Sequence, residues 1–535
     1  MKIIKSLSAF LMIAVICVCS CSCSRRDSSP ESKVIYYNLA SEPDTLDPQI
    51  AADKSSELII TNIFEGLVRL DKNGDITEGA ASDWDISVDG RQYTFHLRDG
   101  LKWSNGDDLT ASDFEYGLMR SVSSQTNSPT ASTLFCIKGA EKINKGQSDD
   151  SSLGVTAKNS KTLVITLEYP EDQLLYLLTT PPAMPCNKSF FESSGGQYGR
   201  TDEKIICNGA FTLDKGDWKS KESFFLTRNV NYRGKEKPVP AGISLSIGKE
   251  YDNLCDAIIE GQTDCGSIGR DDLDKAKKNN LKLTSFENYL WGISFNTEND
   301  ILNNTGIRQS LLSFIDKNYL LKDIPEHCSG SDNIIPESAK LDGKNYRKIA
   351  GDITYTKTDD PGKLFKKSLK ELDKVSIPNM TILCLKDEKS QAFVNDLIET
   401  WNKATGAYFN KKPLTEQELR ERVFSGSFQI AIAPLDISSD SPQEIISAFS
   451  SDSEINPSAL NSEFYDSLVD EVKDDLTISS LATIKQAETA ILDNALFYPL
   501  YIEYRYCASA SNIDNIIFRS YDQDIDFFYA TKKEE

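Results

Sequence analysis

Side chains that could carry out catalysis are scarce in this sequence. Its 535 residues include only two histidines, His96 and His327. His96 alternates with apolar neighbours in a predicted strand, so we expect its ring to face solvent. His327 precedes Cys328, but adjacent residues of an extended chain point to opposite sides, which disfavours a thiol–imidazole pair. The sequence contains no GxSxG, P-loop, GxGxxG or HExxH motif either. We therefore expect a protein that is not an enzyme.

Metal and redox sites are also hard to assemble. Of the 12 cysteines, four lie in the first 23 residues and the other eight are widely spaced without a CxxC pair. This spacing disfavours zinc and thioredoxin-like chemistry, so we expect buried thiols, with one or two disulfides as the alternative for an exported chain. Asp71, Asn73 and Asp75 resemble the start of a calcium loop, but no glutamate closes it. We expect no metal and no cofactor. The eight cysteines are Cys136, Cys186, Cys207, Cys255, Cys265, Cys328, Cys384 and Cys507.

Acidic residues outnumber basic ones. The sequence has 81 Asp and Glu against 59 Lys and Arg, a formal charge of -22 and a pI near 4.7. Nucleic-acid binding needs clustered cations, so this balance argues against it. Carboxylates are so numerous that pairs suited to a glycosidase would arise by accident. The hydrophobic fraction of 39% is typical of a soluble globular protein, and the length predicts about two to four domains.

The first residues have the features of an export signal. Lys2 and Lys5 precede an apolar stretch over residues 7–18, which is too short to span a bilayer. The following Val-Cys-Ser-Cys run at 18–21 resembles a bacterial lipobox. We expect a signal peptide over residues 1–20, lipidation of Cys21, and a polar tether over residues 21–33. Lipidation of Cys23 and plain secretion without a lipid are the alternatives.

Behind the tether, the chain mixes strand and helix patterns without a repeat. Asn73 and Gly74 predict a tight hairpin turn. Beyond residue 361 helices and strands alternate, which indicates an α/β lobe. The pattern predicts a strand at 293–296, then helices over 361–373, 391–404 and 442–449, with strands over 379–385 and 428–432. Residues 508–520 are strand-like again and are expected to return to an earlier sheet.

One stretch carries several motifs in order. Residues 41–120 contain SEPDTLDP, then NIFEGLVRLDKNGDITEGAASDWDISVDG, and then YTFHLRDGLKWSNGDDLTASDFEYGLMR. With these motifs the chain resembles family 5 of the bacterial extracellular solute-binding proteins, the oligopeptide- and dipeptide-binding group. NGAF at 208–211, GQTD at 261–264 and IRQ at 307–309 extend the resemblance over essentially the whole mature chain.

The resemblance implies an α/β fold of the periplasmic-binding-protein type (type II, in its large class with an extra inserted domain). Two lobes would close by a hinge around a ligand cleft. Lobe I would comprise residues 34–64, 187–288 and 506–535, the inserted domain residues 65–186, and lobe II residues 289–505. In relatives an extended peptide pairs its backbone with protein strands, and water adapts to its side chains.

The resemblance also assigns contacts by position. The first contact falls at Ala52, Asp53 and Lys54. Ser267 is a further candidate, and Trp291 is either a wall of the cleft or a core tryptophan. The second contact falls within residues 433–440, at Ala433, Pro434, Leu435, Asp436, Ser438 and Asp440.

This last segment departs from the family pattern. Peptide-binding relatives often have a GWxADY run here, and its aspartate pairs with the amino terminus of the ligand. This chain reads PLDISS, so that Ser438 takes the aspartate position. A buried ammonium needs a compensating charge. Asp436 or Asp440 could supply it after a small shift of the loop; otherwise the ligand is a modified peptide or is anchored elsewhere.

The resemblance implies a monomeric substrate-binding lipoprotein that captures short peptides and delivers them to the permease subunits of an ABC importer. It would be anchored by its lipid to the outer face of the cytoplasmic membrane, or lie in the periplasm of a cell with two membranes. Another solute, such as an oligosaccharide, a metal chelate or a signalling peptide, is the alternative ligand. A surface hydrolase is the remote alternative.

Overall fold

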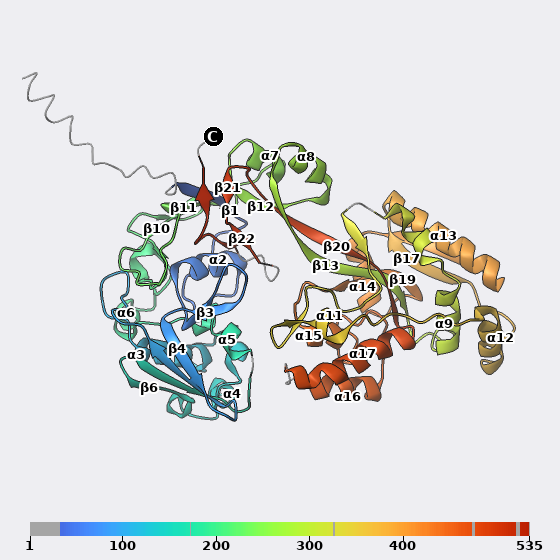
Figure 1. Cartoon of the computed structure of the whole chain (residues 1–535), viewed down its shortest axis with the longest axis horizontal. Coiled ribbons are helices and arrows are strands. Elements are labelled where there is room, and N and C mark those ends of the chain that lie inside the picture. The colour runs from blue at the N-terminus through green and yellow to red at the C-terminus, as the bar shows by residue number, and fades with distance from the viewer. Residues whose placement is uncertain (1–32, 172, 325–326, 473–476, 520–524, 534–535) are drawn as a thin grey trace, which may run out of the picture.

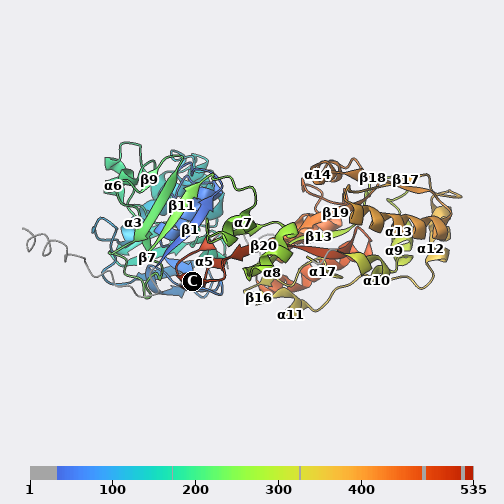
Figure 2. The same ribbon diagram turned by 90° about the horizontal axis from the view of Figure 1, so that it is seen from above.

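Two α/β bodies joined by long strands make up the computed structural model of the chain (Figure 1). The structure describes residues 33–171, 173–324, 327–472, 477–519 and 525–533. The expected signal peptide and most of the tether, including Cys21, lie outside the described residues. Figure 2 shows the two bodies end to end, with β13 and β20 at their junction, and Figure 1 shows β12 beside them. The two-lobed α/β architecture expected from the sequence is therefore confirmed.

Lobe I contains a five-stranded sheet in the order β1-β11-β10-β8, with β9 beside β10. Phe224 and Leu226 alternate with less buried residues in β10, as expected for a strand with one face on a core. Helix α2 (Lys54–Ile63) adds Ile59 and Ile63 to that core. The strands are β1 (Val34–Leu39), β8 (Phe211–Thr212), β9 (Trp218–Lys219), β10 (Ser223–Arg228) and β11 (Gly242–Ile247).

The inserted domain has its own antiparallel sheet but not its own core. Its strand order is β4-β5-β7-β6, and the buried residues of this sheet join those of lobe I in one continuous cluster. Helix α3 (Ala111–Val122) begins with a capping box formed by Thr110 and Asp113. The strands are β4 (Ala81–Ile86), β5 (Gln92–Leu97), β6 (Val155–Asn159) and β7 (Thr162–Thr166).

A hairpin links lobe I to this domain. Strands β2 (Val68–Leu70) and β3 (Ile76–Glu78) pair antiparallel. Gly74 has a φ of +84° at their turn, a conformation that glycine adopts without steric cost. The hairpin predicted at Asn73 and Gly74 is therefore confirmed.

Lobe II is a seven-stranded sheet with helices on both faces. Its order is β12-β20-β13-β19-β17-β18, with β14 beside β20. The strands are β12 (Cys265–Ile268), β13 (Lys282–Phe295), β14 (Cys328–Gly330), β17 (Met380–Leu385), β18 (Phe409–Leu414), β19 (Ile430–Asp436) and β20 (Phe497–Ser509).

Two separate apolar clusters lie on the two faces of this sheet. One includes residues of α9 (Thr305–Ser313), α12 (Pro361–Glu371), α13 (Glu388–Thr405) and α14 (Glu416–Phe424). The other includes residues of α11 (Tyr346–Ala350), α15 (Pro442–Ser447), α16 (Glu463–Val472) and α17 (Leu481–Asp493). Residues 430–437 of the sheet contribute to both clusters, so β19 is fixed from both sides.

The junction between the lobes consists of strands. β13 has 14 residues and β20 has 13, and the first half of β13 is more exposed than the second. A small apolar cluster with α7 (Leu254–Ile259) and α8 (Leu273–Lys278) supports this half. β12 pairs with β20 and so belongs to the sheet of lobe II, although residues 187–288 were assigned to lobe I. The domain boundaries themselves stay a prediction.

The tail returns to lobe I after β20. β21 (Ile513–Asp514) pairs with β24 (Thr531–Lys532), and β22 (Ile517–Phe518) pairs with β23 (Ile525–Asp526). Phe527 and Phe528 of this tail are buried in the core of lobe I. No helix in the described part of the chain is long and apolar enough to cross a membrane.

Candidate binding site

The segment 433–440 of lobe II contains the free edge of a strand. Ile437 N donates to Asn288 O (3.1 Å) and Asn296 N donates to Gln429 O (3.0 Å). In an antiparallel ladder the hydrogen-bonding residues alternate, so the odd-numbered residues of β19 bond to β13. The even-numbered residues therefore direct their backbone groups to the other side. Pro434 is one of these residues and needs no partner in β13.

The other side of β19 is only partly covered. β17 pairs with it at Ile430 and Ala431 alone. Among the described strands, none pairs with this side beyond Ala431. The bridge at Ala431 uses the N–H of Ile432, so the outward backbone groups from the Ile432 carbonyl to Asp436 remain available to an added strand. Pro434 offers its carbonyl there but no N–H.

Asp436 is the last residue of β19, and its exposed carboxylate already accepts hydrogen bonds from a neighbouring residue. Its Oδ1 accepts hydrogen bonds from Ser438 N (2.9 Å) and from Ser438 Oγ (2.7 Å). The structure thus brings Asp436 and Ser438 together as a local turn. This arrangement gives the loop its shape. It also makes Asp436 a weaker candidate for pairing with a positively charged group of the ligand.

Asp440 has different surroundings. Burial raises the pKa of its carboxyl group above the usual aspartate range, and Glu444 adds to the shift while Lys340 opposes it. Its backbone carbonyl accepts from Lys340 N (2.7 Å). The carboxylate is therefore partly desolvated, and Lys340 acts on it through its charge without forming an ion pair within 4 Å among the described residues. Of the two aspartates, Asp440 is the better acceptor for a cationic group.

The inserted domain approaches Asp440 through Tyr176. Burial raises the pKa of the Tyr176 hydroxyl, and Asp440 and Asp75 raise it further, while Arg519 lowers it. Tyr176 Oη donates to Gly74 O (3.2 Å) in the β2–β3 turn. Tyr176 lies in helix α5 (Leu174–Leu177) of the inserted domain. The inserted domain and lobe II therefore face each other at this point.

The three residues assigned to lobe I lie at the start of α2. Asp53 is its N-cap and accepts from Ser56 N (2.9 Å) and Asp44 N (3.1 Å). Lys54 forms an ion pair with Glu57 (3.3 Å). Ala52 is exposed just before the cap. The Asp53 side chain therefore holds the helix, and only the backbone of this segment remains for a ligand.

Ser267 and Trp291 lie in the strands that join the lobes. Ser267 in β12 is exposed, and its hydroxyl donates to Tyr506 O (3.3 Å). Trp291 in β13 is only 2% exposed and packs in a core of lobe II. Its Nε1 donates to Glu503 Oε2 (2.7 Å), and its ring stacks on Tyr501. This placement agrees with a core tryptophan, which was one of its two interpretations.

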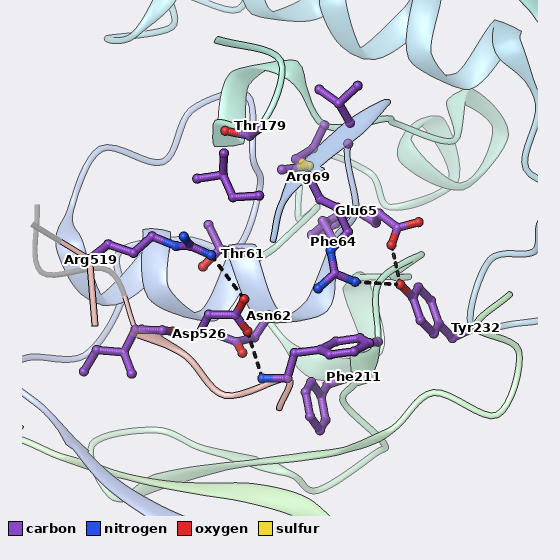
Figure 3. A pocket seen from close by; sticks show the side chains of 17 residues that line it. Thr61, Asn62, Phe64, Glu65, Arg69, Thr179, Phe211, Tyr232, Arg519 and Asp526 are labelled. Carbon is purple, nitrogen blue, oxygen red and sulfur yellow. Dashed lines mark hydrogen bonds and ion pairs between the residues drawn. The ribbon is translucent and has the colours of Figure 1, made fainter. Parts of the chain in front are cut away.

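A cavity of about 120 Å³ in lobe I was not predicted from the sequence (Figure 3). Arg69 of β2 and Arg519 of the tail line it, and they are 450 positions apart in the chain. No local motif joins such distant residues, so sequence patterns offered no signal for it. The other charged lining residues are Glu65 and Asp526.

The described cysteines are free thiols. Seven of them are buried and Cys328 is partly exposed. Burial raises the pKa of Cys207 and of Cys186 to about 12, so these thiols stay protonated and unreactive near neutral pH. The prediction of buried thiols is therefore confirmed for the seven.

Comparison with known proteins identifies relatives across most of the chain. The model of the family "Bacterial extracellular solute-binding proteins, family 5 Middle" matches residues 75–457. The dipeptide-binding protein DppE of Bacillus subtilis is 25% identical over 479 residues, covering 88% of this chain and 86% of DppE. The "Probable deoxycholate-binding periplasmic protein YgiS" of Escherichia coli is 26% identical and covers 88% of both chains. The structure of Listeria monocytogenes OppA bound to peptide has a TM-score of 0.61 at 21% identity, covering 94% of this chain and 100% of OppA.

Proposed function

Because this chain belongs to family 5 of the bacterial extracellular solute-binding proteins, we propose that it captures short peptides outside the membrane and delivers them to the permease of an ABC importer. The observation that carries the proposal is the free edge of β19, which ends beside the desolvated carboxylate of Asp440. A peptide needs both features: a strand edge for its backbone and an anion for its amino terminus. DppE and OppA, whose names refer to dipeptides and oligopeptides, support the same ligand class.

A peptide would bind as an additional strand on β19. Main-chain hydrogen bonds provide affinity without reading side chains, which suits a protein that takes many sequences. Pro434 removes one donor from this edge, so the ligand carbonyl opposite it would be left to water. The backbone at Ala52, Asp53 and Lys54 would contact the peptide from lobe I.

The amino terminus of the peptide would pair with Asp440. Transfer of an ammonium out of water costs several kcal/mol unless a charge compensates it. Asp440 is already partly desolvated in the ligand-free protein, so binding need not meet the whole cost of removing water from this carboxylate. Asp436 contributes through its turn with Ser438, which shapes the loop between β19 and Asp440.

The family consists of transporter binding proteins and not of enzymes, in keeping with the scarcity of catalytic groups. A second ligand class has one specific observation in its favour. YgiS, described by its name as deoxycholate-binding, covers as much of this chain as DppE does. We keep a non-peptide solute as the alternative ligand.

Identification of the bound solute tests the proposal. The mature chain is purified from its host under native conditions and then denatured, and the released compounds are analysed by mass spectrometry. We expect a mixture of short peptides, and saturable binding of synthetic tri- to pentapeptides to the stripped and refolded protein by calorimetry. Binding of deoxycholate together with no binding of any peptide would contradict the proposal and favour the alternative.

We further propose that Cys21 carries a lipid that holds the protein at the outer face of the membrane, where it works as a monomer beside the permease. The Val18-Cys19-Ser20-Cys21 run and the polar tether support this localisation. A Cys21→Ser chain is expected to appear in the soluble fraction with unchanged peptide affinity, and a Cys23→Ser chain is the matched control that stays on the membrane. Membrane retention of the Cys21→Ser chain would refute the anchor.

A further inference from the structure

The cavity in lobe I is built around two arginines. Figure 3 shows the Arg69 and Arg519 side chains reaching it from different elements, with Asp526 beside them. Arg69 lies on β2, Arg519 follows β22, and Asp526 ends β23. The volume of about 120 Å³ accommodates a few waters or one small oxyanion but not a peptide.

The hydrogen-bonding capacity of these guanidinium groups is barely used. Arg69 donates one bond to the described residues, to Tyr232 Oη at 3.5 Å. Arg519 donates two bonds to Asp71 O, at 3.5 and 3.4 Å, and one to Asp526 Oδ2 at 3.4 Å. Every one of these distances lies beyond the usual range for N–H···O bonds. A guanidinium group has five donors.

Arginines that hold elements of this chain together make shorter hydrogen bonds than Arg69 and Arg519 do. Arg120 donates to Asp47 Oδ2 (2.8 Å) and Gln49 Oε1 (2.6 Å). Arg308 donates to Leu302 O and to Asn494 O, each at 2.6 Å. These groups hold elements together with short bonds. Arg69 and Arg519 are placed beside an open volume instead.

The ion pairs around the cavity leave Arg69 without a carboxylate of its own. Glu65 binds Arg98 and accepts from Tyr232 Oη, so its carboxylate is already engaged. Asp526 also accepts from Phe528 N (2.8 Å), and it is the remaining carboxylate of the cavity. The cavity is lined by two guanidinium groups (Arg69, Arg519) and two carboxylates (Glu65, Asp526). Arg98 takes Glu65 and Arg519 takes Asp526, so Arg69 has no carboxylate within ion-pair distance among the described residues, and an anion in the cavity would supply one.

We propose that this cavity is an anion-binding subsite, in which Arg69 and Arg519 together hold a carboxylate or a phosphate-like oxyanion. Arginine forks match the geometry of both groups and form short charge-assisted bonds with them. Thr61 and Thr179 line the same cavity, but their hydroxyl groups already donate to Glu57 O (3.0 Å) and Tyr176 O (2.8 Å), so the two arginines would make the contacts with the anion.

The anion could come from two sources. Arg519 lies within electrostatic reach of Tyr176, as does Asp440 of lobe II, so the cavity is close to the facing surfaces of the lobes. A carboxylate of the transported ligand is therefore one source, and this assignment rests on the proposed function. A free inorganic anion is the other source. The subsite itself does not depend on what is transported.

Calorimetric titration of the stripped mature protein with sodium phosphate, at constant ionic strength, tests the subsite. Saturable binding is expected in the unchanged protein, with a loss of at least about tenfold in affinity in Arg69→Gln and in Arg519→Gln. Arg91→Gln is the matched control, because Arg91 is exposed on the inserted domain and has the same charge. Arg69 also packs over the ring of Phe528 (4.2 Å); should its variant fail to fold, Arg519→Gln decides the question.

Peptides with a free or an amidated carboxyl terminus separate the two sources. If the ligand supplies the anion, the free-acid peptide competes with phosphate and binds more tightly than its amide, and Arg519→Gln abolishes the difference. If a free anion occupies the cavity, phosphate binds without competition. Absence of phosphate binding, together with equal affinities of acid and amide in all variants, would overturn the subsite. Phosphate binding without any peptide binding would contradict the proposed function but would still support the anion-binding subsite.

Discussion

Asp436 and Asp440 lie four positions apart and have different environments. Asp436 is exposed and accepts two bonds from Ser438, whereas Asp440 is largely buried with a raised pKa. A carboxylate that is already desolvated and lacks a bonded cation gains more from an ammonium than one saturated by a serine. The sequence suggested either residue, and the structure gives a physical reason to prefer Asp440.

We therefore predict that Asp440→Asn weakens binding of peptides with a free amino terminus by about 2 kcal/mol, roughly 30-fold in Kd. Binding of the N-acetylated peptides is expected to change little, because they carry no ammonium. Asp436→Asn is the matched control with a smaller effect. Calorimetric titration of all three chains with both peptide forms measures this, and a uniform loss for both forms would show that Asp440 does not contact the amine.

The same residue predicts a pH dependence with a definite sign. Asp440 must be ionised to pair with an ammonium, and burial raises its pKa. Acidification through that pKa protonates it, so affinity for free-amine peptides falls as the pH is lowered. The Asp440→Asn chain and the N-acetylated ligands are expected to lack this dependence.

Residues of the candidate site were predictable only where they lie close together in sequence or match a family motif. Ser438, Asp436 and Asp440 fall in one loop after one strand, so alignment to a motif found the segment. Arg69 and Arg519 meet only because the tail returns to lobe I. Trp291 kept two interpretations because an aromatic side chain in a strand fits either a core or a wall, and its burial favours the core.

Among helices and strands, the periodicity of apolar residues predicted those that are well buried. The predicted helix 391–404 lies within α13, the helix 361–373 corresponds to α12, and the strand 379–385 corresponds to β17. β18 was not predicted, because an edge strand with two lysines and a proline shows no apolar alternation. α14 was missed as well, although the capping box of Thr415 and Glu418 marks its start.

The joining strands show why strands at a hinge are hard to predict from sequence patterns. Only residues 293–296 of β13 were expected to form a strand, whereas β13 spans Lys282–Phe295. Its first half is solvated and lacks a continuous apolar face, so alternation is weak there. β20 is likewise only partly buried from Glu503 to Tyr506. Strands that cross between two bodies with only a small apolar cluster beside them carry little hydrophobic signal.

The tail illustrates a similar limit. Residues 508–520 were expected to rejoin an earlier sheet, and instead β21 to β24 form two short ladders of their own. They are held to lobe I by Phe527 and Phe528. The chain therefore passes from lobe I to lobe II and back, so that any relative movement of the lobes must be absorbed where β13 and β20 cross.

For the whole molecule, the arrangement of two cores joined by strands predicts a change of shape on binding. Each lobe keeps its own apolar clusters, so a rotation about β13 and β20 breaks little packing. A ligand that touches β19 and the start of α2 together contacts both lobes, and it therefore stabilises the conformation in which they are closest.

We predict that a bound peptide reduces the radius of gyration in solution. A compact chain of this length has a radius of gyration of about 24 Å, and the ligand-free protein is expected to exceed this value. Small-angle X-ray scattering should show a decrease towards it as peptide is added, with half of the change at the calorimetric Kd. Under the same conditions Asp440→Asn should need a higher concentration of free-amine peptide for the same decrease. A saturating peptide that leaves the scattering profile unchanged would mean that the two lobes do not move relative to each other, and that binding reaches the transporter by another route.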